Sequence, residues 1–139
     1  MKKAVSMLMF FVLTLVFNTT ICAQHKSNAI IQRTELIVPF STVKADSTNL
    51  IIFGKEELMK VERLICENKD YQIIEYSFTF IGEDGFVSQI KSSNNIFTPE
   101  MKKTISNLKS GKHVWIEEIY CKGPDNKIVE IQRIPITIK

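Results

Sequence analysis

The residues of this 139-residue chain with the most evident chemistry are its three cysteines. Cys22 lies at the end of an apolar N-terminal segment, whereas Cys66 and Cys121 lie far apart in the rest of the chain. In an oxidising compartment the later two could form a structural disulfide. The alternative is a pair of buried free thiols that act as small apolar side chains. The sequence leaves both possibilities open.

Two histidines and two adjacent glutamates are the other candidates for catalysis or metal binding. Neither His25 nor His113 has a second ligand at the spacing of a zinc site. Glu117 and Glu118 are neighbours in a predicted strand, so we expect them on opposite faces, which does not suit a carboxylate pair. The glutamate that faced the core would need a partner for its carboxylate, and Arg133 is one candidate. With no phosphate loop or nucleophile elbow, we expect no enzyme and no catalytic, cofactor-binding or metal-binding residue.

Residues 1–23 have the organisation of a secretory signal peptide. Two lysines precede an apolar run at 7–17, and Ala23 supplies a small residue at the expected cleavage point. The run is shorter than the roughly 20 residues of a membrane-spanning helix, so we expect cleavage and no stable membrane span afterwards. Lipid attachment at Cys22 is disfavoured because the bulky Ile21 precedes it. The expected location is the periplasm or the exterior, with 24–139 as a single domain.

The net charge of the chain bears on whether it binds nucleic acid. Two of the 18 basic residues lie in the signal segment, which has no acidic residue, so the remaining basic side chains nearly balance 15 acidic ones. Sequence-independent binding to nucleic acid depends on concentrated positive charge. We therefore expect no nucleic-acid partner.

The elements that must position these residues are mostly strands. In 71–81, Ile74, Tyr76, Phe78 and Phe80 alternate with polar residues, which predicts a strand with one apolar face. Apolar positions also change phase between Ile131 and 134, which predicts a bulge or bend near residue 133. Further strands are predicted at 34–40, 48–53, 86–90, 114–121 and 128–138. We expect a mostly β domain, an antiparallel Ig-like β-sandwich.

One short surface helix is predicted near 99–110. Thr98 can cap its N-terminus, Pro99 suits the first helical position, and Met101, Ile105 and Leu108 form one apolar stripe. The segment 55–66 fits a helix or a strand equally well from its periodicity.

A tight turn is predicted between the last two apolar runs. Its residues are Gly123, Pro124, Asp125 and Asn126, which are types that turns favour. We interpret the turn as structural, with the role of fixing the register of the terminal hairpin.

These features together resemble the C-terminal module of the gliding-motility protein GldM of Bacteroidota, over about residues 55–139. The matching features are the helix start at Phe97-Thr98, Gly111 followed by Val114, Ile116 and Ile119, the turn at 123–126, and the final Ile134, Ile136 and Ile138. The resemblance implies a short helical turn at 55–59 and a strand at 60–66. The sequence departs from the family at 66–70, where it has a cysteine followed by polar residues in place of the family's aromatic run.

The resemblance implies a non-enzymatic, periplasmic protein–protein interaction module that binds an envelope protein and can form a homodimer. It implies an accessory role in the envelope or in type IX secretion. The full family protein has a membrane helix and further periplasmic domains ahead of this module, so we do not expect its force-transmitting role here. A small secreted enzyme inhibitor and a lipid-anchored surface protein remain alternatives.

Overall fold

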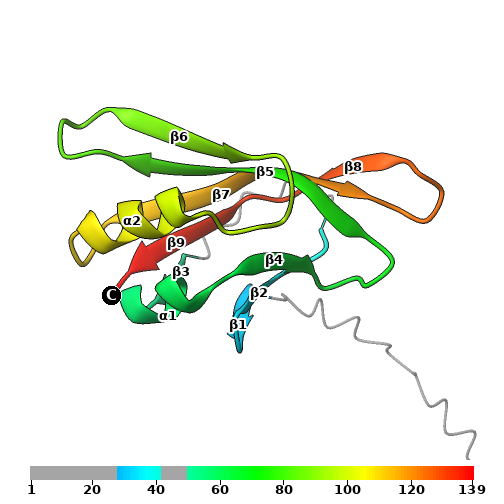
Figure 1. The fold of residues 1–139 in the computed structure, drawn as a ribbon, viewed down its shortest axis with the longest axis horizontal. Helices are drawn as coiled ribbons and strands as arrows, with labels where there is room; N and C mark the ends of the chain where they lie inside the picture. Colours follow the sequence, from blue (N-terminus) through cyan, green and yellow to red (C-terminus); the bar gives the residue numbers. More distant parts are fainter. Residues whose placement is uncertain (1–27, 42–49) are drawn as a thin grey trace, which may run out of the picture.

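The computed structural model describes residues 28–41 and 50–139, which form two β-sheets and two short helices (Figure 1). The predicted signal peptide, Cys22 and His25 lie outside the described residues. The fold is mostly β with few helices, so the predicted sandwich with a short helix is confirmed.

The larger sheet has six strands and forms the centre of the domain. Its strands follow the order β3-β9-β7-β5-β6, and β8 also pairs with β7. The bounds are β3 (Ile51–Phe53), β5 (Gln72–Ile81), β6 (Val87–Ser92), β7 (His113–Lys122), β8 (Ile128–Ile131) and β9 (Ile134–Ile138). The two ten-residue strands, β5 and β7, lie side by side in the middle.

The smaller sheet has three strands, β1 (Ile30–Gln32), β2 (Glu35–Val38) and β4 (Arg63–Cys66). Its free side at β4 is bordered by the segment that follows β6. There the Leu64 N–H donates to the carbonyl of Asn95 (2.8 Å), and the Phe97 N–H donates to the carbonyl of Glu62 (2.8 Å). The link between β6 of the large sheet and the second helix therefore borders the small sheet.

Two pairings in the structure are parallel, between β2 and β4 and between β3 and β9, where the sequence predicted an antiparallel sandwich. Parallel neighbours need a crossover connection. The chain between β2 and β4 contains β3 and helix α1 (Lys55–Lys60), which supply that crossover. The helical turn and strand implied for 55–66 are confirmed by α1 and β4.

The second helix, α2 (Pro99–Asn107), lies on the large sheet through one face, as predicted. The Thr98 hydroxyl accepts a hydrogen bond from the Met101 N–H (3.3 Å), and both Met101 and Ile105 are buried. The helix ends at Asn107 with Leu108 in an extended conformation. The left-handed Gly111 (φ 84°) lies in the turn that leads from the helix to β7.

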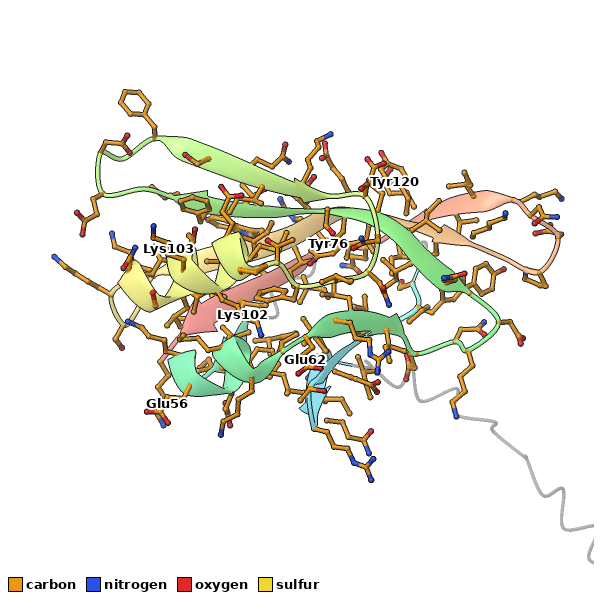
Figure 2. The ribbon with its side chains drawn as sticks, viewed as in Figure 1. Glu56, Glu62, Tyr76, Lys102, Lys103 and Tyr120 are labelled. Carbon is orange, nitrogen blue, oxygen red and sulfur yellow. The ribbon has the colours of Figure 1, made fainter. Side chains whose placement is uncertain are left out.

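The core lies between the large sheet and the layer formed by α2 and the small sheet. Tyr76 is wholly buried, and its hydroxyl donates to the carbonyl of Ile96 (2.7 Å) in the segment that borders β4. Burial raises the pKa of Tyr76. Figure 2 shows Tyr76 on the inner side of the sheet, while Tyr120 lies on the opposite side. The outer side is not covered by any element of the described residues.

The pairing of β7 with β8 and β9 keeps one register along its whole length. Ile116 lies opposite Ile134, and Ile119 lies opposite Ile131. All four are buried, although the step between them is three residues in each strand. Since side chains alternate with a period of two, both strands reverse their faces at the same level. The bend predicted near residue 133 is confirmed, because β8 ends at Ile131 and β9 begins at Ile134.

The loop between β7 and β8 contains the predicted turn. The Asn126 N–H donates to the carbonyl of Gly123 (3.0 Å), and the Gly123 N–H donates to the carbonyl of Lys127 (2.9 Å). Asn126 has a left-handed backbone (φ 61°), and the Asp125 carboxylate accepts from the Lys127 N–H (3.1 Å). Gly123 is packed closely, because a Cβ there would lie 2.9 Å from the Tyr71 ring. Its role in fixing the register stays a prediction.

We expect two glycine exchanges in this turn to act in opposite directions. Asn126→Gly should leave the free energy of unfolding unchanged or raise it by up to about 1 kcal/mol, because glycine enters the left-handed region without a Cβ clash. Gly123→Ala should lower it by about 1–3 kcal/mol, because the Tyr71 ring must move. Urea unfolding of the purified variants measures both. A Gly123→Ala protein as stable as the parent would contradict the close packing.

Candidate interaction surface

The outer face of the large sheet is organised by an extra residue in β7. Ser77 pairs with Glu117 and Glu75 with Tyr120, so β7 has one more residue than β5 between these pairs. Glu118 takes up the extra length in a left-handed conformation (φ 50°). Such a β-bulge reverses the alternation of side chains along the strand that contains it.

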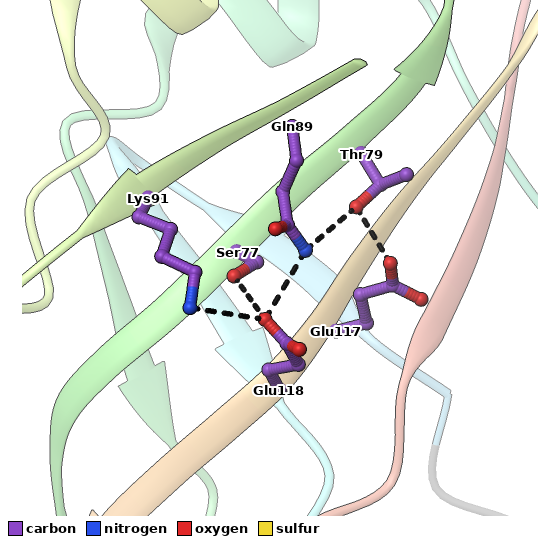
Figure 3. A network of polar contacts seen from close by, with 6 residues as sticks. All are labelled: Ser77, Thr79, Gln89, Lys91, Glu117 and Glu118. Carbon is purple, nitrogen blue, oxygen red and sulfur yellow. Dashed lines mark hydrogen bonds and ion pairs between the residues drawn. The ribbon is translucent and has the colours of Figure 1, made fainter. Parts of the chain in front are cut away.

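The bulge places both Glu117 and Glu118 on the outer face, so the expectation of opposite faces was wrong. Ser77 and Thr79 are two residues apart in β5 and therefore share one face. The Thr79 hydroxyl donates to Glu117 Oε1 (2.6 Å), and the Ser77 hydroxyl donates to Glu118 Oε2 (2.6 Å). Two adjacent carboxylates thus lie over two buried hydroxyl groups (Figure 3).

A bulge in β5 compensates for the one in β7. Ile73 pairs with Cys121 while Glu75 pairs with Tyr120, which leaves Ile74 as the additional residue. Ile73 is therefore the buried residue, and the prediction that Ile74 shares the core face with Tyr76 was wrong.

Side chains of β6 complete the polar cluster around Glu118. Gln89 Nε2 donates to Glu118 Oε2 (3.1 Å), and Lys91 Nζ lies 3.7 Å from the same oxygen. The hydrogen bond from Ser77, together with the charge of Lys91, lowers the pKa of Glu118 below its usual value. The carboxylate therefore stays ionised to lower pH than an ordinary glutamate, and Lys91 lies beside it as a counter-charge.

Arg133 does not pair with either glutamate. Among the described residues, the ion pair of this cluster joins Glu118 to Lys91, and Glu117 is satisfied by the Thr79 hydroxyl. Within residues 28–41 and 50–139, no group of three or more histidine, cysteine or acidic side chains is placed to hold a metal ion. His113 is the exposed first residue of β7, where its Nδ1 lies 2.9 Å from the Thr137 hydroxyl. The cluster thus forms a hydrogen-bonded polar surface.

An exposed apolar pair adjoins this surface at the tip of the β5–β6 hairpin. The side chains of Phe86 and Val87 are 72% and 69% exposed. Both large apolar side chains would lose contact with water if a partner covered them. The two residues are adjacent and lie at the start of β6, which is an edge strand of the large sheet (Figure 1). They therefore form a small apolar patch beside a sheet edge.

Within residues 28–41 and 50–139, no strand pairs with the other edge of β6. The Gly82 N–H donates to the carbonyl of Phe86 (2.9 Å), so these two residues form a hydrogen-bonded pair. In an antiparallel ladder hydrogen-bonded and non-hydrogen-bonded pairs alternate, so the next pair, Ile81 with Val87, is non-hydrogen-bonded. By this alternation the backbone groups of Val87, Gln89 and Lys91 point away from β5. Edge strands are often protected by proline or by outward lysines. Here β6 has no proline, and its lysine is held over the sheet by Glu118.

One signal in the sequence could have revealed the arrangement of the carboxylates. Buried apolar residues in β7 occur at 114, 116, 119 and 121, with a step of three in the middle. The same three-residue spacing separates the apolar residues Ile131 and Ile134, where the sequence predicted a bend. Two facing strands with the same step predict a shared reversal, and hence two adjacent outward side chains at 117 and 118.

The remaining predicted site residues lie on the inner side of the sheet or at its end. Cys66 and Cys121 are both free thiols buried in the same core cluster. The turn at 123–126 closes the β7–β8 hairpin, at the opposite end of the large sheet from the tip of the β5–β6 hairpin (Figure 1).

Comparison with known proteins gives one family. Residues 67–139 match the family described as the GldM C-terminal domain. A search of curated proteins finds no match.

We expect Ser77→Ala to move the pKa of Glu118 up toward its usual range, because the bond from Ser77 is the largest cause of the lowering. A carboxyl NMR titration measures this value. Since the pKa in the folded state lies below that of the unfolded chain, the associated stabilisation is present above the usual carboxyl range and declines as the pH falls through the folded-state pKa. Thr79→Ala is the matched control, since Thr79 bonds to Glu117. An unchanged Glu118 pKa in Ser77→Ala would refute the assignment.

Proposed function

The chain belongs to the GldM C-terminal domain family, and on this basis we propose that it is a non-enzymatic module that binds another protein of the cell envelope. The family supports a role related to type IX secretion. The single observation that carries the proposal is the exposed pair Phe86 and Val87 beside the open edge of β6.

The mode of binding that this edge supports is strand addition. An extended partner segment would pair with the outward backbone groups of Val87, Gln89 and Lys91. Phe86 would supply a large apolar contact at the start of the strand, as aromatic residues commonly do in interfaces. The polar cluster beside it adds hydrogen-bonding groups, and Lys91 offsets the charge of Glu118, one of its two carboxylates. A second copy of the chain is a further partner within this proposal.

The proposed location is the periplasm, after removal of residues 1–23. The described residues include no helix that is long and apolar enough to cross a membrane. Export to the periplasm would place the open edge among other envelope proteins and would expose the chain to oxidising conditions.

Photo-crosslinking in the cells that produce the protein tests the proposal. A photoreactive amino acid at position 86 should give a discrete crosslinked product with an envelope protein. The same amino acid at Met59, an exposed apolar residue of α1, should give much less of that product. Equal products from both positions would contradict the assignment of this surface.

Two variants of one residue separate strand addition from side-chain contact. Gln89→Pro removes an outward N–H and should reduce the crosslinked product from position 86 at least tenfold, because proline cannot donate to an added strand. Gln89→Ala loses the same side chain but keeps the N–H, and should reduce it little. A full yield from a folded Gln89→Pro protein would show that the edge is not used.

Intact-mass analysis tests the proposed export. Protein from the periplasmic fraction should begin at Gln24, because the apolar run is too short to remain in the bilayer. A diacylated product that begins at Cys22 would instead identify a lipid-anchored protein.

A further inference from the structure

The two cysteines in the core belong to different sheets. Cys66 is the last residue of β4 in the small sheet, and Cys121 lies in β7 in the large sheet. Both are buried in the same apolar core cluster, and Ile73, just beyond the loop that follows Cys66, pairs with Cys121. The described residues contain no other cysteine, so each thiol has one partner for a disulfide within this part of the chain.

We propose that Cys66 and Cys121 form a disulfide between the two sheets, with Cys66 as the attacking thiol and Cys121 as the resolving thiol. The link is independent of the binding function proposed above. Its oxidant is a disulfide, either of a small molecule or of a dithiol oxidase.

The surroundings of the two thiols differ in a way that assigns these roles. Cys66 ends its strand, and the residues after it form the loop to β5. Cys121 is the penultimate residue of the central strand β7, where pairing partners on β5 and β8 flank it on both sides. Strand ends and loops open locally at lower free energy than central strands do. Cys66 is therefore the thiol that an external disulfide reaches first.

The ionisation of the thiols agrees with the same assignment. The hydrogen bond from Cys121 lowers the pKa of Cys66 to about 7, and a bond from the Asn68 backbone acts in the same direction. The same thiol–thiol bond, with burial, raises the pKa of Cys121. Since the thiolate is the nucleophile in exchange, the lowered pKa of Cys66 favours this thiol for the first attack.

The exchange has two steps. The Cys66 thiolate attacks one sulfur of the oxidant, which forms a mixed disulfide and releases the other sulfur as a thiolate. Cys121 then gives up its proton to solvent, and its sulfur attacks the Cys66 sulfur, which releases the second oxidant sulfur as a thiolate. The two protein thiols are oxidised by two electrons, and the oxidant disulfide is reduced to two thiols.

The bond would cross-link β4 to β7, which lie far apart in the sequence, although the chain itself passes from β4 into the large sheet through the short loop to β5. It would close a loop of about 55 residues, which restricts the unfolded chain. In the folded state it would fix the small sheet at its last residue to the centre of the large sheet.

Oxidised glutathione at neutral pH is the probe. We expect the folded protein to become about 2 Da lighter, to resist alkylation at both cysteines until it is reduced, and to melt roughly 10 °C higher than after reduction. Reductant should leave the melting temperature of the Cys66→Ser, Cys121→Ser double variant unchanged. Full alkylation of both thiols in folded protein after glutathione treatment would overturn the proposal.

Single variants test the order of attack. Cys121→Ser should accumulate a glutathione adduct at Cys66 at least tenfold faster than Cys66→Ser accumulates one at Cys121. The adduct rate at pH 6 should be several-fold lower than at pH 8 for Cys66. Equal rates in the two variants would overturn the assignment of roles. The adduct masses do not report whether a variant was folded during the reaction. The circular dichroism of each variant therefore checks its fold separately.

Discussion

The reversal of side-chain faces halfway along β7 is the constraint on which the rest of the structure depends. Val114 and Ile116 face the core on one parity, and Ile119 and Cys121 face it on the other. A regular strand would bury one of these pairs and expose the other. The left-handed residue Glu118 allows both pairs to be buried, and the neighbouring strands repeat the adjustment, so that one continuous core extends under the whole sheet.

The same reversal gives the outer face its character. It brings two carboxylates side by side, which would repel each other if both were unpaired. Each instead accepts a hydrogen bond from a buried hydroxyl of β5, and one is further neutralised by Lys91. The lysine is thereby directed across the sheet and away from the edge of β6. An adjustment that serves the core thus also positions the polar side chains beside the edge strand.

Local patterns allowed much of this fold to be predicted. The capped helix after Thr98 and the long strand at 71–81 follow from spacing and residue type alone, and the break after Ile131 follows from a change of apolar phase. What could not be predicted depends on partners distant in the chain. The three-residue strand β1 is too short for a pattern, the parallel pairings leave no local signal, and the outward position of Glu117 and Glu118 depends on the register with β5.

The matched three-residue steps at 116–119 and 131–134 have a consequence for how this family can vary. A single-residue deletion in one step would turn half of that strand inside out against a neighbour that had not changed. The two three-residue steps should therefore be gained or lost together in evolution. In an alignment of relatives, a gap at one of them should be accompanied by gaps at the other and at the compensating bulge of β5, and chains that lack all three should have straight strands with the two carboxylate positions reduced to one.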